Sequence, residues 1–452
     1  VATFPSPPAG IYTIAVRANP IDNSDHEPDP ASYDLKVTAV DIVNLAFTGQ
    51  SVAVGGQLEG AWRFFRVDVP AGALGLDVWA KNITSGNPQV VVRRDQLPHA
   101  VATLPNNWGE WVTYATSWPS GNSWTSYKDW SGYRVDPGGP AVEYRRLVAA
   151  IGRPMEPGTY YIGVYNNAGS GAGAYTLASR GIGADGSGCA LEAEPLAFAG
   201  GSTAISGLEA RDGRFFKVSV PPNTRSWQVK VSQTEGELLL LACKDTVPDI
   251  RWSESADVIN PWGFGSVGMS KSGDEIYHLL PKDGAEYLET GDYYLAVVSQ
   301  GVNPVNPGNV GPYDPIGTGT SSGTIQSVGG IPVTDLGNAT GTAIVHPDTL
   351  AAGEIKLYRI QVPADTSVLE VVTDNRVGNP RVSIVAGLAA PQPNELFNNY
   401  SDSYGWDYGQ TTNSSRNEEP ATGNNPDVAT FPSPPAGIYT IAVRANPIDN
   451  SD

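Results

Sequence analysis

Cysteine and histidine are both scarce in this sequence, with two of the first and four of the second among 452 residues. Two cysteines are too few for a disulfide scaffold, and the histidines fit no metal-binding spacing such as HExxH. No apolar run approaches the roughly 20 residues that a membrane-spanning helix needs. We therefore expect neither a histidine-ligated metal centre nor a membrane span.

Catalytic motifs are nearly absent as well. The single GxSxG string, Gly319–Gly323, stands between a Gly/Thr-rich linker and a strand pattern, whereas a nucleophile elbow needs a strand before it and a helix after it. No phosphate loop or dinucleotide fingerprint occurs. We expect a protein that is not an enzyme.

Basic residues are in the minority, with 28 Lys and Arg against 47 Asp and Glu, so the formal net charge is −19. Such a surface repels polyanions and disfavours nucleic acid as a partner. No long stretch carries the apolar stripe of an amphipathic helix. Instead, 51 glycines and 37 prolines separate short runs that are rich in Val, Ile, Tyr and Thr, which predicts an all-β fold.

The first 25 residues, Val1–Asp25, recur letter for letter as Val428–Asp452, at an offset of 427 residues. Two interpretations are open: near-perfect tandem repeats of about that length, or a chain that overlaps itself at a subunit junction. We favour tandem repeats, and we expect this chain to be a window onto a longer head-to-tail array.

A degenerate repeat lies within that length. RFFRVDVP from Arg63, RFFKVSVP from Arg214 and KLYRIQVP from Lys356 each alternate apolar and polar residues, reach a proline turn, and then alternate again. A third apolar run, a long polar and aromatic loop, a Tyr-rich strand and a closing strand follow. Period-two alternation indicates strands with one buried face, so the pattern predicts tandem antiparallel β-sandwiches.

The strand Pro157–Val164 (PGTYYIGV), the Y/F-x-V/I-x-V-P strand ends and the closing Y-x-L strand resemble the bacterial pre-peptidase C-terminal (PPC) domain family. The resemblance covers nearly the whole chain and is weaker in the middle module, whose closing strand lacks the tyrosine. It implies jelly-roll-like β-sandwiches that accompany secreted hydrolases or decorate bacterial surface proteins, and hence an extracellular or cell-surface location.

The pattern predicts module boundaries. Residues 1–40 hold the last two strands of a preceding module, 43–184 and 195–330 are complete modules, and 340–452 lack a closing strand. The missing strand type occurs only near the other end of the chain, at Ser32–Thr38. An open strand edge attracts backbone partners, so we expect closure by covalent continuation or by a strand from another chain.

Acidic residues crowd the loop before that strand. Carboxylate oxygens on a tight loop are suitable ligands for Ca²⁺, although no recognised calcium-loop spacing is present and a solvated acidic loop is the alternative. Calcium is the one cofactor that the sequence suggests. The candidate ligands are Asp22, Asp25, Glu27 and Asp29.

Aromatic residues are concentrated in the long loops. They can pack over their own sandwich, form an interface with another copy, or stack on the sugar rings of surface glycans. The candidates are Trp108, Trp111, Trp118, Trp124, Trp130 and Trp406.

Cys189 precedes the second module and Cys243 ends one of its strands. In an extracellular setting we expect a disulfide between them, which would tie the linker to the sandwich, with two buried thiols as the alternative.

The sequence favours a structural role: a repeat unit of a secreted bacterial fibre, stalk or cell-surface coat, whose main partners are copies of itself. The alternative is a set of ancillary modules that bind the substrate or glycan of a secreted hydrolase.

Overall fold

The computed structural model describes residues 8–17, 32–37, 39–95, 97–98, 130–131, 146–149, 155–167, 169–210, 212–248, 266–269, 273–281, 285–302, 319–377, 380–391, 415–416 and 427–445. These residues form strands, turns and extended segments, with no helix among them. The prediction of an all-β protein is confirmed.

The structure contains three modules that follow one another along the chain. The first module comprises β1 (Ile42–Leu45), β2 (Gln50–Gln57), β3 (Trp62–Val69), β4 (Gly75–Ser85), β5 (Pro88–Arg94), β6 (Trp130–Ser131), β7 (Arg146–Ala149), β8 (Gly158–Asn166) and β9 (Gly173–Ala184). One of its sheets has the order β1-β3-β8-β5-β6, and the opposing strands have the order β2-β9-β4-β7.

The second module repeats this plan. It comprises β10 (Leu191–Pro195), β11 (Gly201–Glu209), β12 (Gly213–Val220), β13 (Trp227–Glu235), β14 (Glu237–Lys244), β15 (Ser266–Met269), β16 (Glu275–Leu279), β17 (Gly291–Gly301) and β18 (Thr320–Gly329). The strands β10-β12-β17-β14-β15 face the sheet β11-β18-β13-β16.

The third module has fewer strands. It comprises β19 (Val333–Asn338), β20 (Ile355–Val362), β21 (Val368–Thr373), β22 (Arg381–Ala386), β23 (Ser415–Arg416), β24 (Asp427–Pro432) and β25 (Gly437–Arg444). Its sheets have the orders β19-β20-β25-β22 and β21-β24-β23. β3, β12 and β20 occupy the same place in the three modules, as do β4, β13 and β21.

A hydrophobic core lies between the two layers of each module. In the first module Phe65 and Val67 from β3 pack with Leu76 and Val78 from β4. In the second, Phe216 and Leu295 pack with Trp227, Val229 and Ile325 from the opposing sheet. In the third, Tyr358 and Ile441 pack with Leu369 and Phe431. The period-two alternation of the sequence therefore places one face of strands such as β3, β12 and β20 in a core, as predicted.

Two local features recur because the backbone demands them. The turn after each proline has a residue with positive φ at the same position: Gly72 (82°), Asn223 (60°) and Asp365 (62°). Glycine, asparagine and aspartate are the residues that accept this conformation most readily. In addition, Tyr160, Tyr293 and Tyr439 each donate a hydrogen bond to the carbonyl four residues earlier, at 2.8 to 3.0 Å.

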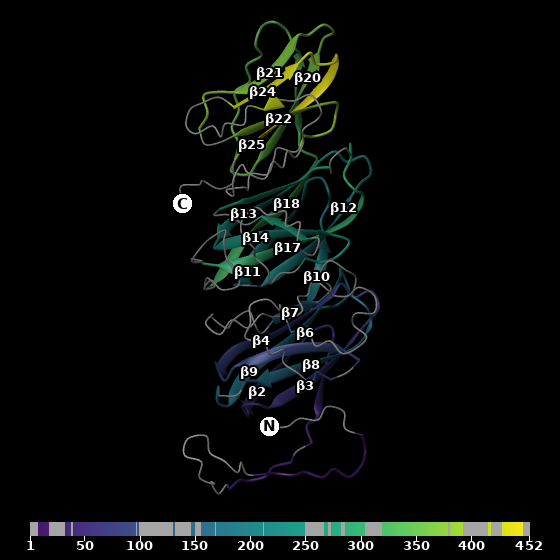
Figure 1. Ribbon diagram of the computed structural model, residues 1–452, viewed down its shortest axis with the longest axis vertical. Coiled ribbons are helices and arrows are strands. Elements are labelled where there is room, and N and C mark those ends of the chain that lie inside the picture. Colours follow the sequence, from purple (N-terminus) through teal and green to yellow (C-terminus); the bar gives the residue numbers. More distant parts are fainter. Residues whose placement is uncertain are drawn as a thin grey trace.

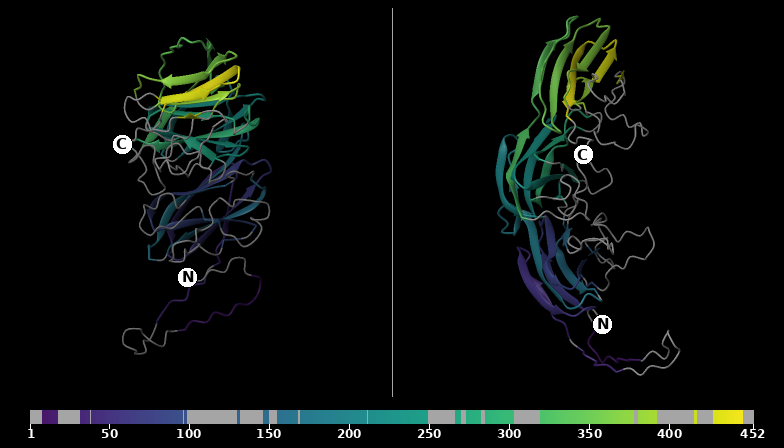
Figure 2. Two further views of the ribbon diagram at one scale, coloured as in Figure 1. Left: turned by 45° about the horizontal axis from the view of Figure 1, so that its top comes forward. Right: turned by 90° about the vertical axis from the view of Figure 1, so that its left-hand side faces the viewer.

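The modules are stacked end to end along the longest axis of the molecule, and the third lies farthest from residues 8–17 and 32–37 (Figures 1 and 2). Each begins with a short strand parallel to its next core strand: Ile42 pairs with Phe64, Ala193 with Phe215, and Val333 with Leu357. The sequence prediction starts the second module at residue 195, the last residue of β10, and the third at residue 340, two residues after the end of β19. It leaves these short strands out because parallel pairing has no local sequence signature.

Candidate assembly surfaces at the junctions and the open edge

The first junction is built into a sheet. β10 pairs in parallel with β9 on one side, where Leu191 lies opposite Ile182, and with β12 on the other, where Ala193 lies opposite Phe215. A single nine-stranded sheet therefore passes from the first module into the second. Backbone hydrogen bonds to both neighbours hold the connecting chain, so the junction is a structural element and not a free linker.

Apolar packing reinforces this junction. Ile182 at the end of β9 is fully buried in a cluster with Phe215, Leu241 and Ala296, which lie on the outer face of the second module's β12, β17 and β14. This cluster is separate from the cores that lie between the layers of the two modules. The outer face of one sheet is thus buried by the end of the preceding module.

A charged group lies beside the apolar cluster. Arg180 of β9 donates to Asp77 of β4, with Nη2 2.5 Å from Oδ2, and also to both carboxylate oxygens of Asp212 in the second module, at 2.8 and 3.0 Å. The Asp77 side chain has no exposed surface. Because a guanidinium presents several donors in one plane, it can bind the two carboxylates at once.

The second junction repeats the apolar arrangement with different residues. Ile331, just after β18, packs with Ile355, Leu357 and Ala442, which lie on the outer face of β20 and β25. Leu280 of the second module covers the same cluster. The end of a module again buries the outer face of the next one.

His278 of β16 makes the polar contacts at this junction. Its Nε2 accepts from the backbone N–H of Ile355 at 3.3 Å, so the same nitrogen is the acceptor for the Gln228 side-chain amide at 2.8 Å. Burial, together with the charges of Arg444 and Lys230, lowers the pKa of the ring well below its ordinary value. The ring is therefore neutral at physiological pH and bridges two modules.

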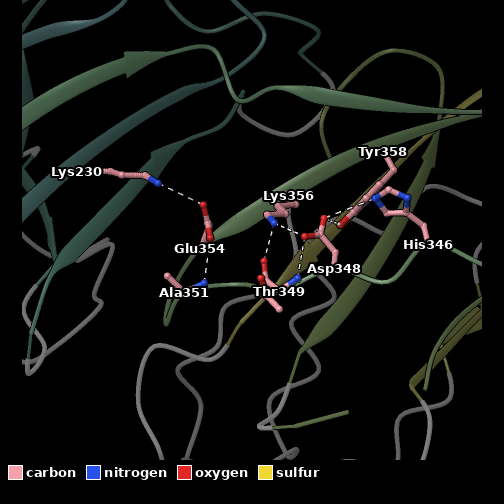
Figure 3. A network of polar contacts seen from close by, with 8 residues as sticks. All are labelled: Lys230, His346, Asp348, Thr349, Ala351, Glu354, Lys356 and Tyr358. Atoms are coloured by element: carbon pink, nitrogen blue, oxygen red, sulfur yellow. Dashed lines mark hydrogen bonds and ion pairs between the residues drawn. The ribbon is translucent and has the colours of Figure 1, made fainter. Parts of the chain in front are cut away.

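Figure 3 shows the ionic part of the same region. Lys230 of the second module reaches Glu354 of the third at 3.3 Å, and Glu354 also accepts from the N–H of Ala351. On the third module, Lys356 and the hydroxyl of Tyr358 both donate to Asp348. The bond from Lys356, followed by the contacts with Thr349 and Tyr358, lowers the pKa of Asp348 to about 2. These contacts hold residues 346–354 against β20.

The first module has the equivalent outer face on β3 and β8, and its own tryptophan covers it. Trp62 packs with Phe64 and Val91, and its ring lies over Gly163 so closely that a Cβ there would be 2.7 Å from Cζ3. The strand registers place Gly163 opposite Phe64, as Ala296 lies opposite Phe215 and Ala442 opposite Leu357. The same face is therefore apolar in all three modules.

The third module has an open edge. In the complete modules the strand that corresponds to β21 is flanked on both sides: β4 lies between β9 and β7, and β13 lies between β18 and β16. Among the described residues, β21 is flanked on one side only, by β24. Residues 342–346, which align with β2 and β11, form no strand there, and Ile344 is 44% exposed. The place of a closing strand lies between these two segments.

The segments near the N-terminus are expected strands that have no sheet to join, whereas the third module has a sheet that lacks a strand. Residues 8–17 and 32–37 are extended and exposed and join no sheet, although both are strands in our expectation for residues 1–40. Their apolar side chains lie in solvent: Ile11 is 100% exposed, Tyr33 62%, Leu35 57% and Val37 72%. Residues 10–17 have the same sequence as β25, in which Tyr439 is 1% exposed. Strand formation here depends on a sheet to join.

The candidate residues for calcium and aromatic contacts fall mostly outside the described residues. Asp22, Asp25, Glu27, Asp29, Trp108, Trp111, Trp118, Trp124 and Trp406 all do. Trp130 lies in β6, opposite Val92 of β5. Among the described residues, no group of three or more His, Cys, Asp or Glu is arranged to hold a metal ion.

The predicted disulfide is not formed in the structure, where Cys189 and Cys243 are both thiols. Cys243 is buried in β14, and its sulfur lies 3.2 Å from the hydroxyl of Thr246. Cys189 lies in the connection between β9 and β10, and a Cβ on Gly183 would be 2.8 Å from its sulfur. Each thiol is accommodated by its own neighbours.

Comparisons with known proteins identify no family. No model of a protein family matches the sequence, and no curated protein matches it. Solved structures match weakly. The CUB1-EGF-CUB2 region of human MASP-1/3 aligns with 62% of this chain and 99% of its own, with 6% identity and a TM-score of 0.15. A protein from Eubacterium rectale that was inferred to be secreted aligns with 59% of this chain and 68% of its own, with 10% identity and a TM-score of 0.16. Such low scores carry no argument about fold or function.

No helix in the described part of the chain is long and apolar enough to cross a membrane.

Proposed function

We propose that this chain is a structural repeat unit of a secreted bacterial fibre, stalk or cell-surface coat, built from modules that join head to tail. The observation that carries the proposal is the sheet that passes unbroken from β9 through β10 into β12. A linker between independent binding modules has no need of such a connection, whereas a rod that must keep its direction does.

The polarity of the junctions supports the same role. At both junctions a residue at or just after the end of a closing strand packs on the outer face of the next module's central sheet: Ile182 near the end of β9, and Ile331 two residues after β18. A contact between two different surfaces, repeated in one direction, generates a filament or a ring of many units and not a closed two-fold dimer. The letter-for-letter recurrence of Val1–Asp25 at Val428 supports an array in which each junction presents the same surfaces.

The finer fold and the location belong to this proposal. We take the modules to be tandem jelly-roll-like β-sandwiches of the PPC kind, supported by the two packed layers of each module and by the strand Pro157–Val164. The proposed site of the assembly is outside the cell, and its partners are further copies of the same unit. Surface glycans and calcium remain secondary partners, proposed on the aromatic and acidic loops of the sequence.

Electron microscopy of a concatenated chain tests the proposal. A two-unit chain is made by continuing directly after Asp452 with residues 26–452, since Val428–Asp452 already supplies the sequence of residues 1–25. We expect straight rods about twice as long as those of the single chain. Particles that bend freely at the added junction would contradict a structural role and favour independent accessory modules.

A further inference from the structure

We propose that residues 32–37 of a second copy of this unit form the closing strand of the third module, inserted between β21 and residues 342–346. This inference rests on the proposed function and specifies the contact through which one unit joins the next.

The complete modules supply the register. In β9, Ser179 lies opposite Val78 of β4 and opposite Gln50 of β2. In β18, Ser327 lies opposite Val229 of β13 and opposite Gly201 of β11. Aligning the closing motifs Tyr175-x-Leu177 and Tyr33-x-Leu35 puts Val37 at the position of Ser179. Val37 then lies opposite Val371. Thr342-Ala343-Ile344 matches Thr203-Ala204-Ile205 of β11, and Ile205 lies opposite Gly323, which has the position of Tyr33, so Tyr33 lies opposite Ile344.

The residues of the third module that would flank the inserted strand are incompletely buried. Val78 and Val229 have no exposed surface, because Leu177 and Ile325 from the closing strands share their cores. Val371, at the same position of β21, is only partly buried. On the other side of the gap, Ile344 is 44% exposed, whereas Ile205 in β11 is 2% exposed. A strand with inward-facing apolar side chains would cover both.

Residues 32–37 provide such side chains. Tyr33, Leu35 and Val37 alternate with polar residues, and all three are more than half exposed. In the second module Ser327 accepts a hydrogen bond from the indole of Trp227. The third module has Leu369 at the position of Trp227, which needs no acceptor, and the inserted strand brings Val37 in place of the serine.

The outward-facing side chains also agree with this register. Lys36 would lie opposite Val372 and diagonal to Glu370, both of which are exposed on β21. Opposite charges at diagonal positions on one face of a sheet attract each other.

The other exposed segment does not fit this gap. Residues 10–17 repeat the sequence of β25, and the third module already contains that strand between β20 and β22. Residues 32–37 repeat nothing that the described third module contains. When a neighbouring unit brings both residues 10–17 and residues 32–37, only residues 32–37 therefore add a strand to the third module.

The inserted strand has to come from another copy. Residues 32–37 lead directly into β1 at one end of the molecule, and β21 lies in the module at the opposite end (Figures 1 and 2). The same direct path from closing strand to parallel strand connects β9 to β10 and β18 to β19. The inference therefore makes the contact between units a third instance of the junctions within the chain.

Cross-linking tests the register. Lys36→Cys and Val372→Cys place two outward-facing thiols directly opposite each other, as Ala178 and Trp79 are in the first module. Lys36→Cys with Glu370→Cys is the off-register control, and each single variant controls for the two native cysteines. The pairs are oxidised both as a mixture of separately made full-length chains and within the two-unit chain, where the first copy carries the β21 variant.

A bond between separate chains that is specific to the Val372 pair supports insertion in trans. A specific bond that forms only in the two-unit chain supports insertion by the next unit of the same polypeptide. No bond in either arm, or equal yields with Glu370→Cys, overturns the inference. Leu35→Asp should abolish the specific bond, while Ile14→Asp, its matched control in the other exposed segment, should leave it unchanged.

The electron microscopy separates this inference from the proposed function. Straight two-unit rods without the specific bond would leave the structural role standing and overturn the inserted strand. A specific bond in particles that bend freely at the junction would support the inserted strand and contradict the structural role.

Discussion

Arg180 and Asp212 lie on opposite sides of the first junction and are joined by two hydrogen bonds, Nη2 to Oδ1 at 2.8 Å and Nη1 to Oδ2 at 3.0 Å. The same guanidinium binds the buried carboxylate of Asp77 within the first module. One side chain therefore links the interior of the first module to the surface of the second. This contact fixes the orientation of the two modules in a way that apolar packing alone does not, since hydrogen bonds are directional.

Replacing Arg180 should destabilise the first junction strongly. Arg180→Ala removes the cation beside the fully buried Asp77, and changes of this kind cost about 3–5 kcal/mol. Asp212→Asn retains the Arg180–Asp77 pair and should cost about 1 kcal/mol. Urea unfolding of the full chain, followed through its first transition, measures both. The control is Arg66→Ala, which removes an exposed ion pair with Asp68 and should cost less than about 1 kcal/mol. Equal losses in Arg180→Ala and Arg66→Ala would contradict this account.

Truncating Ile331 should loosen the second junction without unfolding the adjoining modules. Its side chain belongs to the junction cluster and not to the core of either module. Ile331→Ala should cost about 2–4 kcal/mol in the stability of the contact, because a buried aliphatic group is lost. Small-angle scattering should then report a broader range of inter-module angles, with β-sheet circular dichroism unchanged. Leu58→Ala, an exposed leucine of the first module, is the control and should alter neither signal. Loss of the circular dichroism in Ile331→Ala would show that the residue supports the fold of a module instead.

The second junction should weaken as the pH falls below about 6.5. The folded pKa of His278 lies well below its ordinary value, so between the two values the unfolded chain binds a proton that the folded chain does not. Stability from this group is therefore fully present above the unfolded pKa and is lost on acidification. Asp348 responds at lower pH. Because its pKa in the folded chain is about 2, its contribution to stability is present above pH 4 and is lost as the pH falls from about 4 towards 2.

Melting temperatures between pH 8 and pH 5 test the histidine. His278→Gln should reduce the pH dependence, because glutamine retains hydrogen-bonding capacity and does not titrate in this range. His346→Gln is the matched control, since this ring is 42% exposed and lies on the third module alone, and it should retain most of the dependence. An unchanged slope in His278→Gln would exclude His278 as the source.

The strands were predictable because their signals are local. The repeated Arg63, Arg214 and Lys356 strands appear as β3, β12 and β20, with burial alternating as the residue types do. Turn chemistry follows the same rule. Tyr12 even donates to the carbonyl of Pro8 at 2.6 Å, as Tyr439 does to Pro435, although residues 10–17 join no sheet. A contact between residues four positions apart forms without any tertiary partner.

The junctions were not predictable in this way, because they depend on pairing between distant residues. Nothing in the residues Leu191–Pro195 distinguishes a linker from a strand with parallel neighbours on both sides. The ion pair of Arg180 and the role of His278 are equally invisible, since each requires knowing which faces of two modules meet. The open edge is intermediate: the sequence predicts a missing closing strand, and the structure adds the register in which Val37 would face Val371.

The pair of Gly163 and Trp62 offers a test of the common outer face. Gly163→Ala would place a Cβ 2.7 Å from the indole of Trp62 and 3.1 Å from Pro98, and overpacking of this kind costs about 1–3 kcal/mol. The other modules have Ala296 and Ala442 at this position, together with Gly213 or Ile355 at the position of Trp62.

Combining Gly163→Ala with Trp62→Ile, which reproduces the pair of the third module, should therefore recover part of that loss. The double-mutant cycle measures the recovery as a coupling between the two sites of about 1 kcal/mol or more. Val218→Ala, in the core of the second module and remote from both partners, provides the control, because its cost should add to that of Trp62→Ile without compensation. If Gly163→Ala and Trp62→Ile prove simply additive, then the faces of the three modules are not equivalent, and the first module does not present the surface that a preceding module would need.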